Sequence, residues 1–174
     1  MSMEEALVIF FGKTGAGKNY IAEMFAETYD YYFYDADQDL PDDMRAAIAE
    51  GRTFTDEMRS RYAEIIKDRI AALLDVYPRV AVAQGLFKNR QRHELLNRFS
   101  FAQFVWVDAE DQLIEERVKQ RGNEVTLEYA RKINPLFETP DFDCERILNN
   151  GSGEEIRLEI VRLGAKLKRF NEKR

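Results

Sequence analysis

The chain has 174 residues, 45% of them hydrophobic and 33% charged, which suits one globular domain with a sizeable core. Its net charge of −6 argues against a general nucleic-acid binder, and no run approaches the roughly 18 apolar residues of a membrane span. The acidic start does not resemble a signal peptide and a single cysteine excludes an internal disulfide, so we expect a cytoplasmic protein without nucleic-acid or membrane partners.

The first half of the chain predicts alternating strands and helices. The apolar run ALVIFF at 6–11 is typical of a strand buried on both faces of a parallel sheet. Apolar residues at helical spacing predict a helix over 18–29, and the aromatic run YYFYDAD at 31–37 predicts a second strand. Two more helices are expected, a short one from Pro41 to about Glu50 and a long one from Asp56 to about Val76.

The second half continues this alternation. Strands are expected at 79–85, 101–107 and 145–150. A helix over about 88–98 separates the first two of these strands. Two helices precede the last one, the first capped by Asp108 and ending at about Gln120, the second running from Thr126 to about Leu136. Ser152 and Glu155 have the capping-box spacing for a last helix. Five strands alternating with helices indicate one three-layer α/β/α domain over residues 1–174, with a parallel sheet whose ligands bind beyond the carboxyl ends of the strands.

The segment GKTGAGKN at 12–19 satisfies the phosphate-binding pattern G-x-x-x-x-G-K, between a predicted strand and a predicted helix. Its glycines allow successive backbone N–H groups to turn inward, where they and the helix N-terminus hold phosphate oxygens. The lysine reaches the outer phosphates. The expected ATP-binding residues are Gly12, Lys13, Thr14, Gly15, Ala16, Gly17, Lys18, Asn19 and Tyr20.

Asn19 stands where a Ser or Thr hydroxyl usually ligates Mg²⁺. An amide oxygen can also ligate this ion, but the side chain is longer and Mg²⁺ demands near-ideal octahedral geometry. Three interpretations stay open. Asn19 ligates the ion directly or through water, the ion is held mainly by ATP and Asp35, or metal binding is weak and the protein is a non-catalytic nucleotide-binding regulator.

Asp35 and Asp37 lie at the end of the second predicted strand, next to the phosphate loop in such a sheet. Strand alternation points both carboxylates to the same side. One can join the metal shell, while the other orients or deprotonates a substrate hydroxyl. The pair therefore predicts a kinase site.

With these motifs the chain resembles the P-loop small-molecule kinases of the nucleoside-monophosphate-kinase-like group, above all gluconate kinase and shikimate kinase. The D-x-D after the second strand resembles the shikimate kinase pair, and this resemblance puts Asp35 near the metal and Asp37 on the substrate hydroxyl. EGRTFTDEMRSRY at 50–62, QGLFKNRQRHELL at 84–96 and LFETP at 136–140 resemble gluconate kinase segments. The resemblance implies a sheet order of 2-3-1-4-5, ATP and Mg²⁺ as cofactors, and the substrate-side residues Asp37, Arg59, Gly85, Lys88 and Arg92.

A short lid is expected at about 117–128. Arg117 and Arg121 lie one helical turn apart, just before Gly122 and Asn123 interrupt the helical pattern. Their guanidinium groups could close over ATP and stabilise charge on the transferring phosphoryl group, as the resemblance to lid arginines also implies. Asn150, after the last strand, is placed near the adenine by the same resemblance.

The sequence therefore predicts an ATP-dependent kinase that phosphorylates a hydroxyl of a small molecule, with Lys18, Asp37, Arg117 and Arg121 as catalytic residues. Asn19 and Asp35 are the expected metal ligands. Basic residues on the substrate side are compatible with an anionic acceptor, and both a monomer and a homodimer are compatible with the sequence. A nucleoside or nucleotide kinase, and the non-catalytic ATP-binding regulator, are the alternatives.

Overall fold

The structure, a computed structural model, describes residues 5–172. Five strands make one sheet: β1 (Ala6–Phe11), β2 (Tyr32–Asp35), β3 (Arg79–Ala83), β4 (Gln103–Asp108) and β5 (Glu145–Leu148). The helices are α1 (Lys18–Tyr29), α2 (Asp42–Ala49), α3 (Asp56–Leu74), α4 (Asn89–Arg98), α5 (Asp111–Arg121), α6 (Leu127–Ile133) and α7 (Gly153–Glu172). Two 3₁₀ turns, η1 (Ala36–Asp39) and η2 (Asn134–Leu136), complete the element order.

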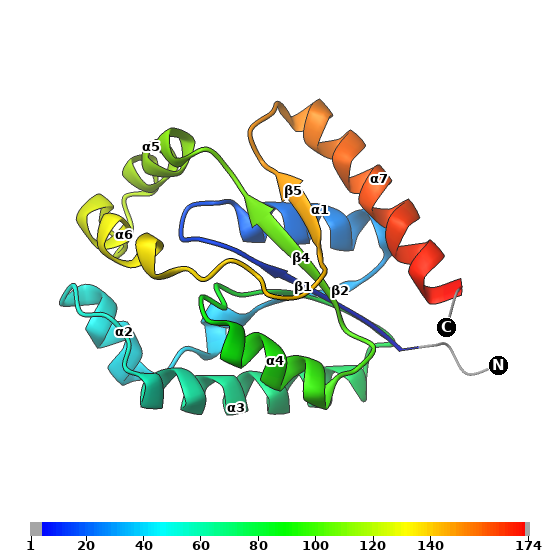
Figure 1. Cartoon of the computed structure of the whole chain (residues 1–174), viewed down its shortest axis with the longest axis horizontal. Helices are drawn as coiled ribbons and strands as arrows, with labels where there is room; N and C mark the ends of the chain where they lie inside the picture. Colours follow the sequence, from blue (N-terminus) through cyan, green and yellow to red (C-terminus); the bar gives the residue numbers. More distant parts are fainter. Residues whose placement is uncertain (1–4, 173–174) are drawn as a thin grey trace.

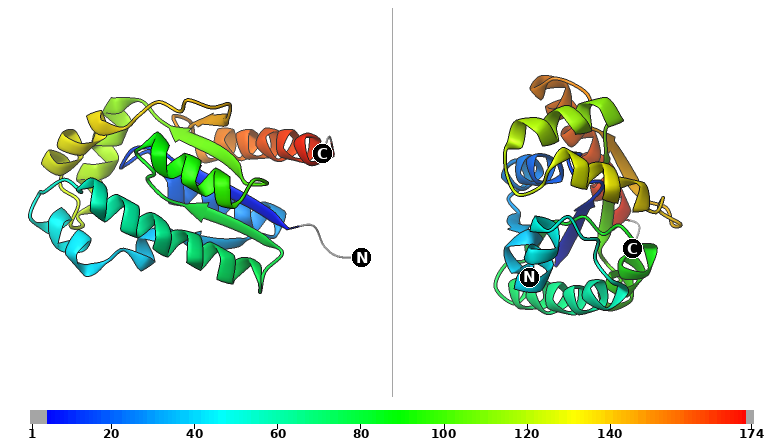
Figure 2. Two further views of the ribbon diagram at one scale, coloured as in Figure 1. Left: turned by 60° about the horizontal axis from the view of Figure 1, so that its bottom comes forward. Right: turned by 90° about the vertical axis from the view of Figure 1, so that its left-hand side faces the viewer.

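The sheet is parallel throughout and its strand order is β2-β3-β1-β4-β5, which confirms the predicted order (Figure 1). β1 lies at its centre, and each of its faces is covered. Val8 and Phe10 pack in one core with α1 and α7, whereas Leu7, Ile9 and Phe11 pack in a second core with α3 and α4. The continuous apolar run of β1 thus serves two cores, and the domain has three layers as predicted (Figures 1 and 2).

The carboxyl ends of the strands point toward one end of the molecule, where α2, α5 and α6 gather (Figures 1 and 2). β2 ends at Asp35, earlier than predicted, because its carboxylate accepts the backbone N–H of Asp37 at 3.0 Å and begins η1. The prediction that Asp108 caps the next helix was wrong. Asp108 is the last residue of β4, where its carboxylate pairs with Arg146 at 2.5 Å, and α5 begins only at Asp111.

Arg92 of α4 is completely buried between the aromatic rings of Phe11 and Phe137, at 4.6 and 4.7 Å from their centroids. Its guanidinium donates to the backbone oxygens of Leu86 and Glu138, each at 2.7 Å. Burial lowers the pKa of Arg92 to about 10, so the group stays charged at neutral pH. Through these contacts Arg92 links the start of α4 to the segment before β5 and stabilises their packing.

Replacing Arg92 by alanine should lower the free energy of unfolding by about 3 kcal/mol, because both carbonyls lose their partner and a cavity opens between the rings. Urea denaturation measures the change. Arg90→Ala on the same helix is the matched control. Its side chain is 71% exposed and pairs with Glu94, so its effect should stay within about 0.5 kcal/mol. Equal effects of the two substitutions would contradict the role given to Arg92.

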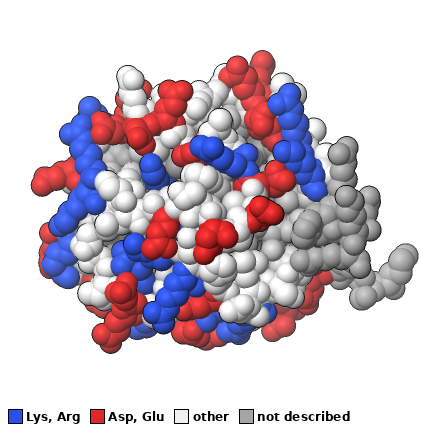
Figure 3. Space-filling model, viewed as in Figure 1, with Lys and Arg blue, Asp and Glu red and all other residues white. Residues whose placement is uncertain are grey.

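Acidic and basic side chains are interspersed on the face seen in Figure 3, without one continuous basic surface. Among residues 5–172, no helix combines the length and apolar character that a bilayer crossing requires.

Candidate active site

The phosphate loop joins β1 to α1 in a conformation that only glycine adopts easily. Gly15 and Gly17 have φ values of +88° and +90°, in the left-handed region. Gly12 sits against the central sheet, where a Cβ atom would lie 2.2 Å from the carbonyl oxygen of Val107. α1 then begins at Lys18, so its free N–H groups open toward the loop. These features form a backbone cradle that fits phosphate groups.

Two asparagines from distant parts of the chain hold this loop. The Asn134 side chain exchanges two hydrogen bonds, each 3.0 Å long, with the backbone N–H and carbonyl of Thr14. Asn149 donates from Nδ2 to the carbonyl oxygen of Ala16 at 3.0 Å and lies against Gly17. Asn150, which the resemblance placed near the adenine, accepts through Oδ1 the backbone N–H of Glu110, the N-cap residue of α5, at 2.9 Å.

Lys18 points its ammonium group into the loop, where Nζ donates to the carbonyl oxygen of Lys13 at 3.0 Å. Burial is the main cause that lowers the pKa of Lys18 to about 8. The negative charges of Asp37 and Asp35 raise this pKa in part, and the positive charge of Arg121 lowers it further. The cation is therefore poorly solvated and gains a strong partner when phosphate oxygens reach it.

ATP affinity should weaken about tenfold between pH 7 and pH 9, because Lys18 must be protonated to pair with phosphate. Below pH 8 the lysine is mostly charged, and above pH 8 binding must take up a proton. The last ionisation of a phosphate group has a pKa of about 6, so the phosphates are mostly ionised from pH 7 upward and do not mask the effect. Calorimetric titrations across this range test it, with Lys18→Arg as a non-titrating control. A flat profile for the unmodified chain would contradict the lowered pKa.

Asn19, Asp35 and Asp37 form a connected polar group beside the loop. Asn19 donates from Nδ2 to Oδ2 of Asp35 at 2.9 Å, and Oδ1 of Asp35 accepts the Asp37 N–H. Burial raises the pKa of Asp37, and the nearby Lys18 ammonium lowers it in part. The bond to Asp35 leaves the amide oxygen of Asn19 free. This oxygen and the Asp35 carboxylate are both ligand types that Mg²⁺ accepts.

Residues 5–172 contain no cluster of three or more His, Cys, Asp or Glu side chains suited to a metal. An ion beside Asp35 would therefore take its other ligands from water and from phosphate oxygens, as Mg²⁺ usually does.

A pocket of about 370 Å³ lies on the other side of the loop, and both predicted lid arginines line it. Arg117 donates to the carbonyl oxygens of Asn149 at 2.5 Å and Ala16 at 3.4 Å, while Arg121 is exposed. Burial lowers the pKa of Arg117, and so does the neighbouring charge of Arg121. The remaining lining residues are Gly17, Tyr20, Gln120, Asn149 and Gly151. This pocket borders the phosphate loop at Gly17.

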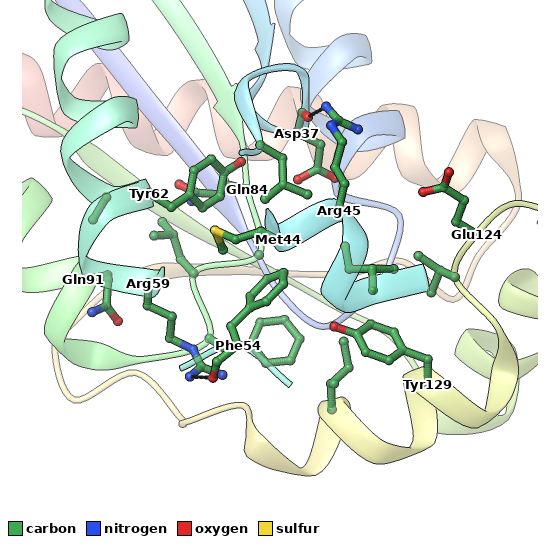
Figure 4. A pocket seen from close by; sticks show the side chains of 18 of the residues that line it. Asp37, Met44, Arg45, Phe54, Arg59, Tyr62, Gln84, Gln91, Glu124 and Tyr129 are labelled. Atoms are coloured by element: carbon green, nitrogen blue, oxygen red, sulfur yellow. Dashed lines mark hydrogen bonds between the residues drawn. The ribbon is translucent and has the colours of Figure 1, made fainter. Parts of the chain in front are cut away.

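A second cavity, of about 400 Å³, opens between α2, α3, α6 and the end of β3 (Figure 4). Three of the predicted substrate-side residues line it, namely Asp37, Arg59 and Gly85. Asn123 to Val125, from the predicted lid, form part of its wall. Arg45, which the sequence analysis missed, also lines the cavity and donates to the carbonyl oxygen of Asp37 at 2.7 Å.

The predicted basic cluster of Arg59, Lys88 and Arg92 is not assembled in this cavity. Lys88 does not line it and pairs with Glu138 at 3.4 Å. Arg92 is buried by the packing described above, so the structure assigns it to stability and corrects its predicted substrate contact. Lys13 of the loop pairs with Asp111 at 3.3 Å.

Solved structures with the same fold include kinases. A gluconokinase from Sinorhizobium meliloti 1021 is 22% identical, with a TM-score of 0.81, over 99% of this chain and 97% of that one. A sugar kinase from Janibacter sp. HTCC2649 is 20% identical, with a TM-score of 0.79, over 91% and 93%. A shikimate kinase from Bacteroides thetaiotaomicron is 15% identical, with a TM-score of 0.57, over 94% and 98%.

No curated protein matches the chain by sequence. The family model for shikimate kinase matches residues 14–141, which is more than half of the chain. This match begins within the phosphate loop and includes Lys18, Asp35, Asp37 and the lid arginines. The chain therefore belongs to the shikimate kinase family, a family of small-molecule kinases with a P-loop fold.

Proposed function

We propose that the protein transfers the terminal phosphoryl group of ATP to a hydroxyl of a small molecule, with Mg²⁺ as the metal. The position of Asp37 carries this proposal. Asp37 lines the 400 Å³ cavity, and its charge and that of Lys18 each shift the pKa of the other. The Lys18 side chain, which would bind phosphate, therefore lies close to the end of the cavity that Asp37 lines. Phosphoryl transfer requires this proximity of phosphate and acceptor.

The residues divide into phosphate-side and acceptor-side groups. The cradle amides and Lys18 would hold the phosphates of ATP, with Asn19 and Asp35 beside the metal. When bound, ATP supplies the phosphoryl group and Mg²⁺ neutralises part of its charge. Asp37 accepts a hydrogen bond from the acceptor hydroxyl and takes its proton, and its raised pKa makes it a better base than an ordinary carboxylate.

Arg117 and Arg121 complete the proposed site from the lid. Both line the pocket beside Gly17, and Arg121 is close enough to influence the pKa values of Lys18 and Asp37. α5 ends at Arg121, and its C-cap residue Gly122, with a φ of +59°, allows the chain to turn toward the cavity. A small movement of this segment would bring Arg121 toward the transferring group and exclude water.

Asn19→Ser should weaken the dependence of turnover on Mg²⁺, raising the half-saturating Mg²⁺ concentration about tenfold. The shorter side chain cannot keep the 2.9 Å hydrogen bond that orients Asp35. A Mg²⁺ titration of ATP turnover measures the change. Asn97→Ser, on α4 away from the loop, is the control. Higher turnover in Asn19→Ser would instead mark Asn19 as a defect and favour the regulator.

A further inference from the structure

Two buried glutamines line the acceptor cavity with their amides unpaired. Gln84 follows the end of β3, and Gln91 lies in the first turn of α4. Each side chain is about nine-tenths buried, at 7% exposure. Within the described chain neither side-chain amide forms a hydrogen bond, and Oε1 of each is shielded from solvent. Figure 4 shows both among the side chains that surround the cavity.

An unpaired buried amide is unfavourable, and most buried polar groups in proteins have partners. The cost is offset when a ligand supplies the missing hydrogen bonds. An amide presents a donor and an acceptor side by side, so its best partner is a similar edge in which an N–H group adjoins a carbonyl or ring nitrogen. Gln84 and Gln91 line the cavity, and a turn of each side chain that brings its shielded oxygen to the cavity surface would let it recognise such an edge.

Tyr129 of α6 adds a third unpaired polar group. Its side chain is 4% exposed, and within the described chain its hydroxyl has no hydrogen-bond partner. In Figure 4 the hydroxyl points toward the middle of the cavity. It can donate to or accept from a bound molecule.

Apolar side chains make up most of the remaining wall, and they include the rings of Phe54 and Phe87. The charged residues of the wall balance, with Asp37 and Glu124 against Arg45 and Arg59. Arg59 donates from Nη1 to the carbonyl oxygen of Phe54 at 2.5 Å, and the same nitrogen lies 3.7 Å from a carboxylate oxygen of Asp56, which offsets part of its charge. A polyhydroxylated acid would bury several hydroxyls against apolar walls here, which is unfavourable. A flat ring suits these walls better.

We propose that the acceptor is a neutral alcohol with a heteroaromatic ring, whose amide-like edge binds Gln84 and Gln91 while its hydroxyl reaches Asp37. This assignment rests on the proposed kinase function. It identifies the class of acceptor and gives the two glutamines the role of specificity-determining residues. Nucleosides belong to this class, whereas gluconate and shikimate do not.

The test compares acceptor classes with the full chain, ATP and Mg²⁺. One set contains the natural nucleosides and pyridoxine, and the other contains gluconate and shikimate. We expect phosphorylation of at least one ring alcohol with a kcat/KM at least about tenfold above that of either acid. Faster phosphorylation of an acid, or phosphorylation of no ring alcohol while an acid reacts, would overturn the assignment.

Variants then test the glutamines directly. Gln84→Leu and Gln91→Leu should each raise the KM of the preferred ring alcohol about tenfold while ATP affinity stays unchanged. The melting temperature should not fall, since each change removes an unpaired buried oxygen. Gln84→Glu keeps the shape and loses the donor, so it should also raise KM. Gln112→Leu, on exposed α5 surface, is the control. Unchanged KM values in the cavity variants would overturn the role.

Binding measured without turnover separates the two proposals. If no compound of either set is phosphorylated but calorimetry detects the ring alcohols and not the acids, the kinase proposal fails and the ligand assignment stands. If an acid is phosphorylated in preference, the kinase proposal stands and the ligand assignment fails.

Discussion

Replacing Lys18 by alanine should lower the kcat/KM for phosphoryl transfer at least about a hundredfold, the size of effect typical of losing a preorganised charge at the reacting group. Lys18 ends inside the phosphate cradle, and in this structure its Nζ has only the Lys13 carbonyl as a hydrogen-bond acceptor among the described residues. Because burial lowers its pKa to about 8, the ammonium stabilises bound phosphate far more than it stabilises the empty loop. ATP binding should weaken together with turnover.

The Lys18→Ala protein should stay folded, because the substitution removes a buried cation that does not stabilise the empty loop. Its thermal unfolding should match that of the unmodified chain. Lys119→Ala is the matched control, because Lys119 is exposed on α5 and outside the site. Turnover that survives in a folded Lys18→Ala protein would refute the role of the phosphate loop.

Replacing Asp37 by asparagine should reduce phosphoryl transfer about a hundredfold or more, as expected for the loss of a general base. The substitution keeps the shape of the side chain and removes its ability to take a proton. ATP affinity should change little at about pH 6.5, where Lys18 remains protonated even without the Asp37 charge. The activity loss should therefore appear in kcat.

A pH profile gives this prediction a second readout. In the unmodified chain, activity should fall on the acid side as Asp37 becomes protonated, at a pH above the range of an ordinary aspartate, because burial raises its pKa. The acid limb should disappear in Asp37→Asn. Asp42→Asn, at the exposed start of α2, should behave like the unmodified chain. A collapse of ATP binding in Asp37→Asn would show that Asp37 acts on the nucleotide instead.

The features that could be predicted from the sequence are those with local causes. The phosphate loop was recognisable because its glycines, its lysine and the start of α1 lie within a few residues of each other. The sheet could be predicted because a strand buried on both faces, such as β1, leaves a continuous apolar run. Asp35 and Asp37 were found because the carboxyl end of a parallel strand lies at the ligand-binding edge of the sheet.

The missed features depend on contacts between distant segments. Asn134 forms hydrogen bonds with Thr14, which lies 120 residues away in the sequence. The residues around Asn134 in the sequence contain no motif that indicates this contact. Arg92 looks like an ordinary charged residue on a helix until Phe11 and Phe137 enclose it. Gln84 and Gln91 belong to no recognisable sequence motif. Their role is inferred from their burial in a cavity wall with side-chain oxygens that lack hydrogen-bond partners, which only the folded structure shows.

One transfer assay decides whether this chain carries phosphoryl groups from ATP to small alcohols. Purified protein is incubated with ATP labelled in its terminal phosphate and a pooled library of hydroxyl compounds, with and without Mg²⁺. We expect a labelled, acid-stable phosphate ester that forms only with Mg²⁺ and is absent with Lys18→Ala. ATP that binds without labelling any compound in the library would contradict it and make the nucleotide-binding regulator the better description.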